Sequence, residues 1–204
     1  MVTLVIIAFT VILSMRALRD KPTLEKLWFE PFQVQYNKEY YRFISHGFVH
    51  GSGAHLFVNM FVFWMFGRKV EAQLGSVTGM PMVMFLLLYL GAIAVAALPG
   101  YLRHRNNPEY RAVGASGAVA AVLFASIVLD PLDPMYIMFV PIPIPGWLVG
   151  IGYLVYEYVQ DKRRQGNIAH DAHFVGALFG VLFMAALRPG LLPAMVERII
   201  GSWS

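Results

Sequence analysis

The sequence has no cysteine and few charged residues. Asp, Glu, Lys and Arg make up 14% of its 204 residues, against roughly 25% in an ordinary soluble domain. The lack of cysteine excludes a secreted disulfide scaffold, and the 58% apolar content excludes a disordered chain. Six segments without any charged residue together cover 128 residues. Because a soluble fold of this size could not cover its surface with so few polar groups, we expect a polytopic membrane protein with almost no extramembrane domain.

The uncharged segments predict an all-α fold with six transmembrane helices in one domain over residues 1–204. A membrane-crossing helix needs about 20 mostly apolar residues. The expected spans are residues 2–18, 54–67, 81–102, 113–129, 146–159 and 168–187. A signal peptide is the alternative for the first segment, which however lacks a basic start and a small-residue cleavage site before Arg16.

Two segments between the spans have unusual compositions. Residues 20–45 mix aromatic residues, prolines and charges, which suits the membrane–water interface. We therefore expect an interfacial first loop made of short amphipathic helices. Residues 141–145 alternate proline with isoleucine, and proline both lacks an N–H donor and clashes with the preceding helical turn. That run predicts an extended loop leading into the fifth span.

The basic residues are distributed unequally on the two sides of the predicted bundle. The loops after spans 1, 3 and 5 hold twelve Lys and Arg residues, whereas the opposite side holds four. Counted alone, this bias would put those loops in the cytoplasm and both termini outside.

Four polar residues stand out inside the predicted spans, where polar side chains are costly and usually functional. They are His55, Asn59, Ser116 and His173. Spans 2, 4 and 6 all begin on the same side of the membrane. The four residues are therefore expected at similar depth near one face.

Ser116 lies in the segment Gly114-Ala115-Ser116-Gly117, at the start of the fourth span. Small neighbours leave its hydroxyl open, and a helix N-terminus offers unpaired N–H donors and a partial positive charge. This arrangement suits a serine nucleophile beside an oxyanion site. The alternative is a helix-capping or packing serine.

His173 precedes Gly176 and Gly180, whose spacing permits close helix packing. Approach to the small residues of the fourth span would allow a Ser116–His173 hydrogen bond, although a structural histidine is the alternative. Asp171 is two residues from His173 and so does not share its helix face. With no other carboxylate recognised nearby, the sequence predicts a Ser–His dyad and not a triad.

His55 and Asn59 are four residues apart, share a helix face and can both donate toward an oxyanion. Polar contact between helices is their alternative role. A zinc site is the further alternative, because His46 and His50 have the spacing of a zinc-binding helix. The catalytic glutamate of that motif is replaced by Gly47, and no cysteine or carboxylate completes a ligand set, so we expect no metal and no cofactor.

Together these residues resemble the rhomboid family of intramembrane serine proteases, from Arg16 to Leu187. The resemblance rests on several motifs in the right order. These are Tyr41-Arg42 ending the first loop, His46 and His50, His55-x-x-x-Asn59, Gly67-x-x-x-Glu71-x-x-x-Gly75, Gly114-x-Ser116-Gly117 and Ala172-His173-x-x-Gly176-x-x-x-Gly180. It implies Ser116 as nucleophile and His173 as base. It also implies oxyanion donors at His55, Asn59 and the Ser116 N–H, structural roles for Gly67, Glu71 and Gly75, and substrate entry near the fifth span and residues 160–169.

The resemblance further implies an endopeptidase acting on single-span membrane proteins in the lipid bilayer. Its bacterial six-span members have both termini in the cytoplasm and an outward-facing active site in the inner membrane. We adopt this orientation against the charge bias.

One departure from the family is Ala120, where many members have an aromatic residue that stacks on the catalytic histidine. The alternatives are an inactive rhomboid-like protein that binds membrane clients and a small transporter or channel, which the charge-free segments disfavour. Nothing in the sequence indicates nucleic-acid binding or sets the oligomeric state.

Overall fold

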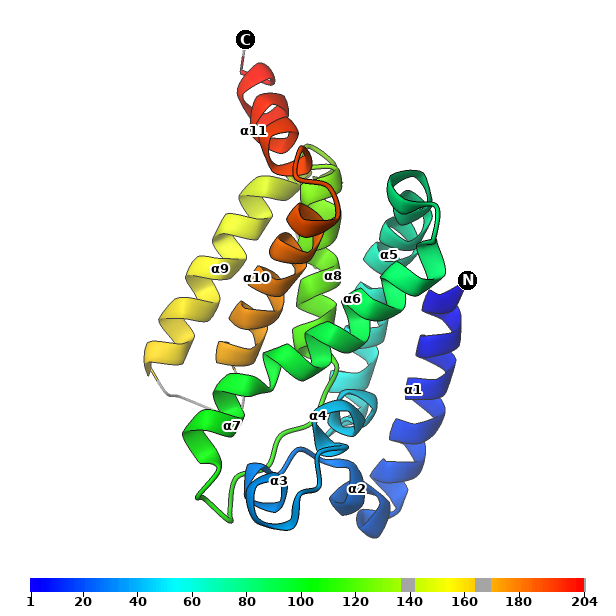
Figure 1. The fold of residues 1–204 in the computed structure, drawn as a ribbon, viewed down its shortest axis with the longest axis vertical. Coiled ribbons are helices and arrows are strands. Elements are labelled where there is room, and N and C mark those ends of the chain that lie inside the picture. Colours follow the sequence, from blue (N-terminus) through cyan, green and yellow to red (C-terminus); the bar gives the residue numbers. More distant parts are fainter. Residues whose placement is uncertain (137–141, 164–169, 204) are drawn as a thin grey trace.

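The computed structural model describes residues 1–136, 142–163 and 170–203. Helices that run in alternating directions dominate this part of the chain (Figure 1). The long ones are α1 (Val2–Arg19), α5 (Gly53–Thr78), α6 (Pro81–Ala96), α8 (Ser116–Leu129), α9 (Gly146–Arg163) and α10 (His170–Leu187). Because of the alternation, α5, α8 and α10 begin at the same end of the bundle, which brings their first turns together.

Short elements connect the long helices. They are α2 (Lys21–Leu27), α3 (Pro31–Asn37), α4 (Arg42–Ser45), the 3₁₀ turn η1 (His46–Phe48), α7 (Leu98–His104), α11 (Leu191–Gly201) and the paired strands β1 (Pro134–Met135) and β2 (Ile144–Pro145). The short helices expected within residues 20–45 are confirmed. Of the predicted extended run, Pro141 lies outside the described residues and residues 144–145 are extended.

Two predicted spans differ from the helices observed. α5 continues beyond residue 67 to Thr78, because charged residues are compatible with a helix. The helix ends at Gly79, whose φ of +70° is left-handed. The third span is broken between α6 and α7. Pro99 lies in the first turn of α7, where it cannot donate to the preceding turn.

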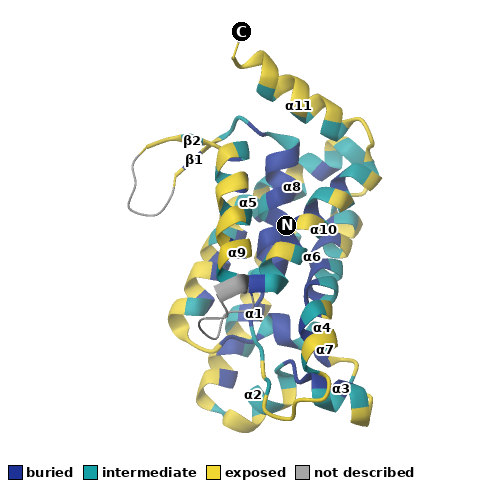
Figure 2. Ribbon diagram, turned by 90° about the vertical axis from the view of Figure 1, so that its left-hand side faces the viewer, coloured by how far each residue is buried: buried dark blue, intermediate teal, exposed yellow. Residues whose placement is uncertain are grey.

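Apolar side chains cover the outside of the bundle as well as its core. Among the described residues, three helical segments are long and apolar enough to cross a membrane, namely Val2–Arg19, Pro81–His104 and His170–Leu187. Figure 2 shows that α8 is buried at the centre, while exposed residues lie on the surrounding helices. The exposed ones include Val5, Phe9, Ile12, Phe57, Ile151 and Val155. Such an apolar exterior suits lipid and not water.

Glu71 of α5 joins the start of α1 to the bundle. Its carboxylate accepts hydrogen bonds from the backbone N–H of Val2 (2.6 Å) and Thr3 (2.9 Å) and from the Thr3 hydroxyl (2.7 Å). These N–H groups have no partner within their own helix. A carboxylate here also complements the positive end of the helix dipole. Glu71 therefore fixes α1 against α5, at the end of α5 opposite to Ser116.

Candidate active site

Ser116 is the first residue of α8 and follows an extended segment that only glycine can complete. Gly114 has a φ of +119°, which side-chain-bearing residues rarely adopt. A Cβ at Gly114 would also lie 2.6 Å from Cε1 of His55. The Gly114 N–H donates to the carbonyl oxygen of His46 (3.0 Å). The segment is thus held in place, and the first N–H groups of α8 are left without helical partners, free to bind a developing negative charge.

α10 approaches α8 almost backbone to backbone. A Cβ on Gly176 would lie 2.1 Å from the carbonyl oxygen of Gly117, and one on Gly180 would lie 2.2 Å from that of Ala121. Both distances are far below ordinary van der Waals contact, so only glycine fits at these positions. This approach places His173, near the start of α10, directly over Ser116.

The serine and histidine are in hydrogen-bond contact. The Nε2 atom of His173 lies 2.6 Å from Oγ of Ser116. A hydroxyl that donates to a neutral imidazole is the geometry needed for proton transfer from a serine nucleophile to a general base. The two residues singled out from the sequence are therefore side by side.

A carboxylate lies beside His173, and the expectation that none does is wrong. Oε1 of Glu157, on α9, is 3.1 Å from Nδ1 of His173, and Oε2 is 2.6 Å from Nδ1 of His170. The side chain of Glu157 is 4% exposed. The prediction of a dyad rests on Asp171, the carboxylate nearest to His173 in the sequence. That carboxylate pairs with Arg103 at 3.2 Å. Glu157 comes from a different helix, so spacing along α10 could not reveal it. Its position inside the predicted fifth span was a usable signal, because charged residues within spans are rare.

His55 and Asn59 lie near the serine in different ways. The ring of His55 lies against Gly114, two residues before Ser116. Asn59 is buried, and its amide donates to the carbonyl oxygen of His55 (3.0 Å). His55 thus lies beside the segment that leads to Ser116. The Asn59 side chain is hydrogen-bonded within α5, one turn further from Ser116.

His46 and His50 support the segment that leads to Ser116. Burial lowers the pKa of His46 to about 4 and that of His50 to about 3, so both rings are neutral at pH 7. The Ala115 N–H donates to Nε2 of His50 (3.4 Å), whose Nδ1 therefore carries the proton and donates to the Ser14 hydroxyl (3.0 Å). Each nitrogen of His50 has a structural partner, which argues against the pair as zinc ligands.

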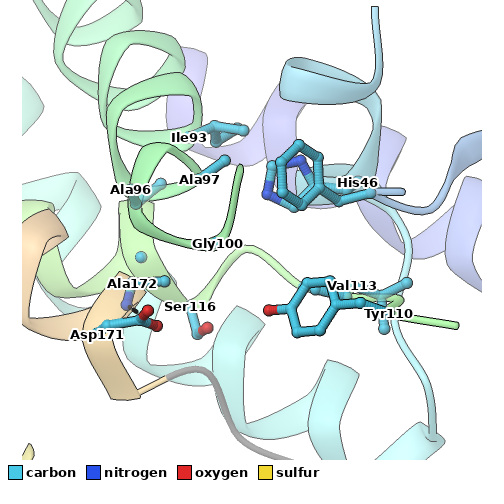
Figure 3. Close-up of a pocket in the computed structure, with 15 residues that line it drawn as sticks. His46, Ile93, Ala96, Ala97, Gly100, Tyr110, Val113, Ser116, Asp171 and Ala172 are labelled. Atoms are coloured by element: carbon cyan, nitrogen blue, oxygen red, sulfur yellow. Dashed lines mark hydrogen bonds between the residues drawn. The ribbon is translucent and has the colours of Figure 1, made fainter. Parts of the chain in front are cut away.

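A small cavity opens beside Ser116 (Figure 3). Its volume is about 40 Å³, which is room for roughly two or three water molecules. Its walls include Ile93, Ala96, Gly100, Tyr110 and Ala172. The cavity can therefore hold water or a small apolar group next to the hydroxyl.

One cluster among the described residues has donors suitable for a metal ion. Glu157, His170 and His173 place one ligand atom each within 4.8 Å of one another. The carboxylate already accepts a hydrogen bond from each imidazole. The three side chains therefore satisfy one another without an ion.

A serine hydrogen-bonded to a histidine at the start of a helix is a hydrolase-like site. The apolar exterior of the bundle indicates that the protein is embedded in a membrane. The Rhomboid domain family model matches residues 37–190. The chain belongs to the rhomboid family and is an integral membrane protein.

Several curated relatives are similar to this chain. It is 27% identical over 163 residues to RHOMBOID-like protein 12, mitochondrial, of Arabidopsis thaliana, a match that covers 72% of this chain and 46% of the relative. It is 30% identical over 134 residues to Rhomboid protease GlpG of Haemophilus influenzae, covering 65% and 64%. Rhomboid protein 1, mitochondrial, of Saccharomyces cerevisiae is 26% identical over 147 residues, covering 69% and 40%. The chain thus spans about half the length of the relatives it matches.

Proposed function

We propose that this protein is an intramembrane serine endopeptidase that cleaves transmembrane segments of single-span membrane proteins. The observation that carries the proposal is the 2.6 Å contact between Ser116 Oγ and His173 Nε2 at the start of α8. The family and the similarity to a rhomboid protease support it. The apolar cavity beside Ser116 suits a substrate with a small residue next to the scissile bond.

The reaction follows from these positions. Ser116 Oγ forms a bond to the scissile carbonyl carbon as its proton moves to Nε2 of His173. The carbonyl oxygen becomes negative and is stabilised by the N–H groups at the start of α8 and by His55 and Asn59. His173 then gives the proton to the leaving nitrogen as the C–N bond breaks. Water then gives a proton to His173 as its oxygen bonds to the acyl carbon, and the bond from that carbon to Ser116 Oγ breaks as His173 returns the proton to Oγ.

The oxyanion role predicts the effect of changing His55. The variant His55→Ala should lower the maximal rate by about 10²- to 10³-fold, the usual loss when one oxyanion donor is removed. Asn59→Ala should also slow cleavage. Thermal unfolding of the detergent-solubilised variants is the control. If the variants were much less stable but each folded molecule cleaved at the wild-type rate, His55 and Asn59 would be packing residues and not oxyanion donors.

The proposed membrane arrangement has six spans in one domain over residues 1–204. We place it in a bacterial plasma membrane with both termini in the cytoplasm and Ser116 facing outward. Alkaline phosphatase fused after Ser204 should then be inactive, because the enzyme matures only outside the cytoplasm. A strongly active fusion would show the opposite orientation, which is the one that the distribution of Lys and Arg indicates.

Cleavage in liposomes tests the proposed activity. The purified chain would be reconstituted with a reporter protein whose single transmembrane segment contains glycine and alanine. The wild type should cut within that segment and Ser116→Ala should not. If both proteins merely bind the reporter, the inactive client-binding alternative is correct.

A further inference from the structure

The geometry points to Glu157 as a positioning residue that holds His173 in the protonation and orientation required of a general base. This inference rests on the proposed function and adds a carboxylate to the Ser116–His173 pair. Its basis is the position of the carboxylate between two imidazoles, 3.1 Å from Nδ1 of His173 and 2.6 Å from Nδ1 of His170. Glu157 itself does not touch Ser116, so it acts through His173.

The carboxylate fixes which nitrogen of His173 carries the proton. An ionised carboxylate only accepts hydrogen bonds, so the proton of the neutral His173 ring is on Nδ1. The lone pair of Nε2 then points at the Ser116 hydroxyl, 2.6 Å away. Without Glu157 the proton could occupy Nε2, and the ring could not accept the serine proton. When His173 takes that proton during the reaction, both ring nitrogens carry hydrogen, and the adjacent carboxylate stabilises the cation without being protonated.

His170 fixes the second oxygen of the same carboxylate. The side chains of His170 and Glu157 are 6% and 4% exposed, and a buried carboxylate with one oxygen unpaired would be costly. The ring of His170 also packs edge to face with that of His173 at 6.1 Å. His170 therefore provides a partner for the second oxygen of Glu157 and helps to keep Oε1 directed at His173.

The packing of α9 brings Glu157 within reach. Tyr153 and Leu154, one turn before Glu157, pack against a buried cluster of Ala120, Phe124 and Ala177. Ala120 has a small side chain and is 3% exposed, so α9 meets α8 and α10 closely there. In Figure 1, α9 lies beside α10 along its length. The small residue at position 120 thus accommodates the helix that supplies the carboxylate.

Labelling of Ser116 by an alkyl fluorophosphonate separates this role from a structural one. The probe reacts with an activated serine, and its concentration dependence gives a maximal rate and an apparent affinity. For Glu157→Gln we expect the maximal rate to fall by about 10²- to 10⁴-fold, as expected when a base loses its orienting carboxylate, with affinity within threefold of the wild type. The maximal rate of Glu157→Asp should be at least tenfold higher than that of Glu157→Gln. Glu197→Gln, the same atom exchange on exposed α11, should label as the wild type does.

His170→Gln provides the decisive comparison. It removes one contact between α9 and α10 but leaves Glu157 beside His173, so its labelling rate should fall less than tenfold. Equal losses of rate and thermal stability in Glu157→Gln and His170→Gln would show a purely structural contact and overturn the inference. So would a Glu157→Gln rate within threefold of the wild type. A wild type that labels no faster than Ser116→Ala would overturn the proposed function itself, and this inference with it.

Discussion

Replacement of Ser116 by alanine is expected to lower peptide-bond turnover by about 10⁴- to 10⁶-fold, the range found when a catalytic serine is removed from a hydrolase. The reason is that, in the proposed mechanism, the nucleophile is the Ser116 hydroxyl, which lies 2.6 Å from Nε2 of His173. The variant loses one hydrogen bond and one oxygen atom at the edge of a cavity. Its thermal stability should therefore stay close to that of the wild type.

The double variant sharpens this prediction. In the proposed mechanism Ser116 and His173 act as a unit, so His173→Ala alone and the combined Ser116→Ala/His173→Ala variant should both be about as inactive as Ser116→Ala. Cleavage of the single-span reporter in liposomes measures all three rates. Independent, multiplicative losses would contradict a shared proton transfer.

Replacement of Gly176 by valine is expected to separate α8 from α10 and abolish the folded state. Even an alanine Cβ would lie 2.1 Å from the Gly117 carbonyl oxygen, where ordinary contact begins at 3.4 Å. Inserting atoms into a packed core usually costs about 1–3 kcal/mol and sometimes more. Here the obstacle is backbone, which cannot rotate aside. We expect Gly176→Ala to cost about 3 kcal/mol, a fall of roughly 10 °C in the unfolding midpoint, and Gly176→Val to cost more.

Gly152 on α9 is the matched control. A Cβ there would meet no atom within 4 Å. Gly152→Ala should therefore be neutral or stabilising by about 0.5–1 kcal/mol, as is usual within a helix. Thermal unfolding in detergent compares the two substitutions. Equal midpoints for Gly176→Ala and Gly152→Ala would refute the close approach of the two helices.

The contact between Ser116 and His173 could be anticipated because it depends on features that are local in the sequence. The order of the spans places both residues at the same end of the bundle. The spacing of Gly176 and Gly180 marks a helix face that can approach a neighbour closely. The short helices within residues 20–45 likewise follow from local composition. These signals need no knowledge of how distant helices pack.

The role of Glu157 and the tolerance of Ala120 depend on packing between distant parts of the chain, which local sequence patterns do not indicate. Glu157 meets His173 only because α9 packs on α10, which no spacing within α10 indicates. The small side chain of Ala120 likewise has a role only through its distant neighbours Tyr153 and Leu154, which pack beside it. The end predicted for the second span at Gly67 is wrong for a local reason, since charged residues follow it but do not end a helix, and α5 extends to Thr78.

The most direct test of the central claim is mass-spectrometric identification of the residue that an alkyl fluorophosphonate modifies in the folded protein. We predict a single adduct on Ser116 in the wild type and no labelling of Ser116→Ala or His173→Ala. An unmodified wild type would mean that Ser116 is not activated, and labelling of His173→Ala at the wild-type rate would mean that His173 is not what activates it. Either result would contradict the assignment of Ser116 and His173 as a catalytic pair.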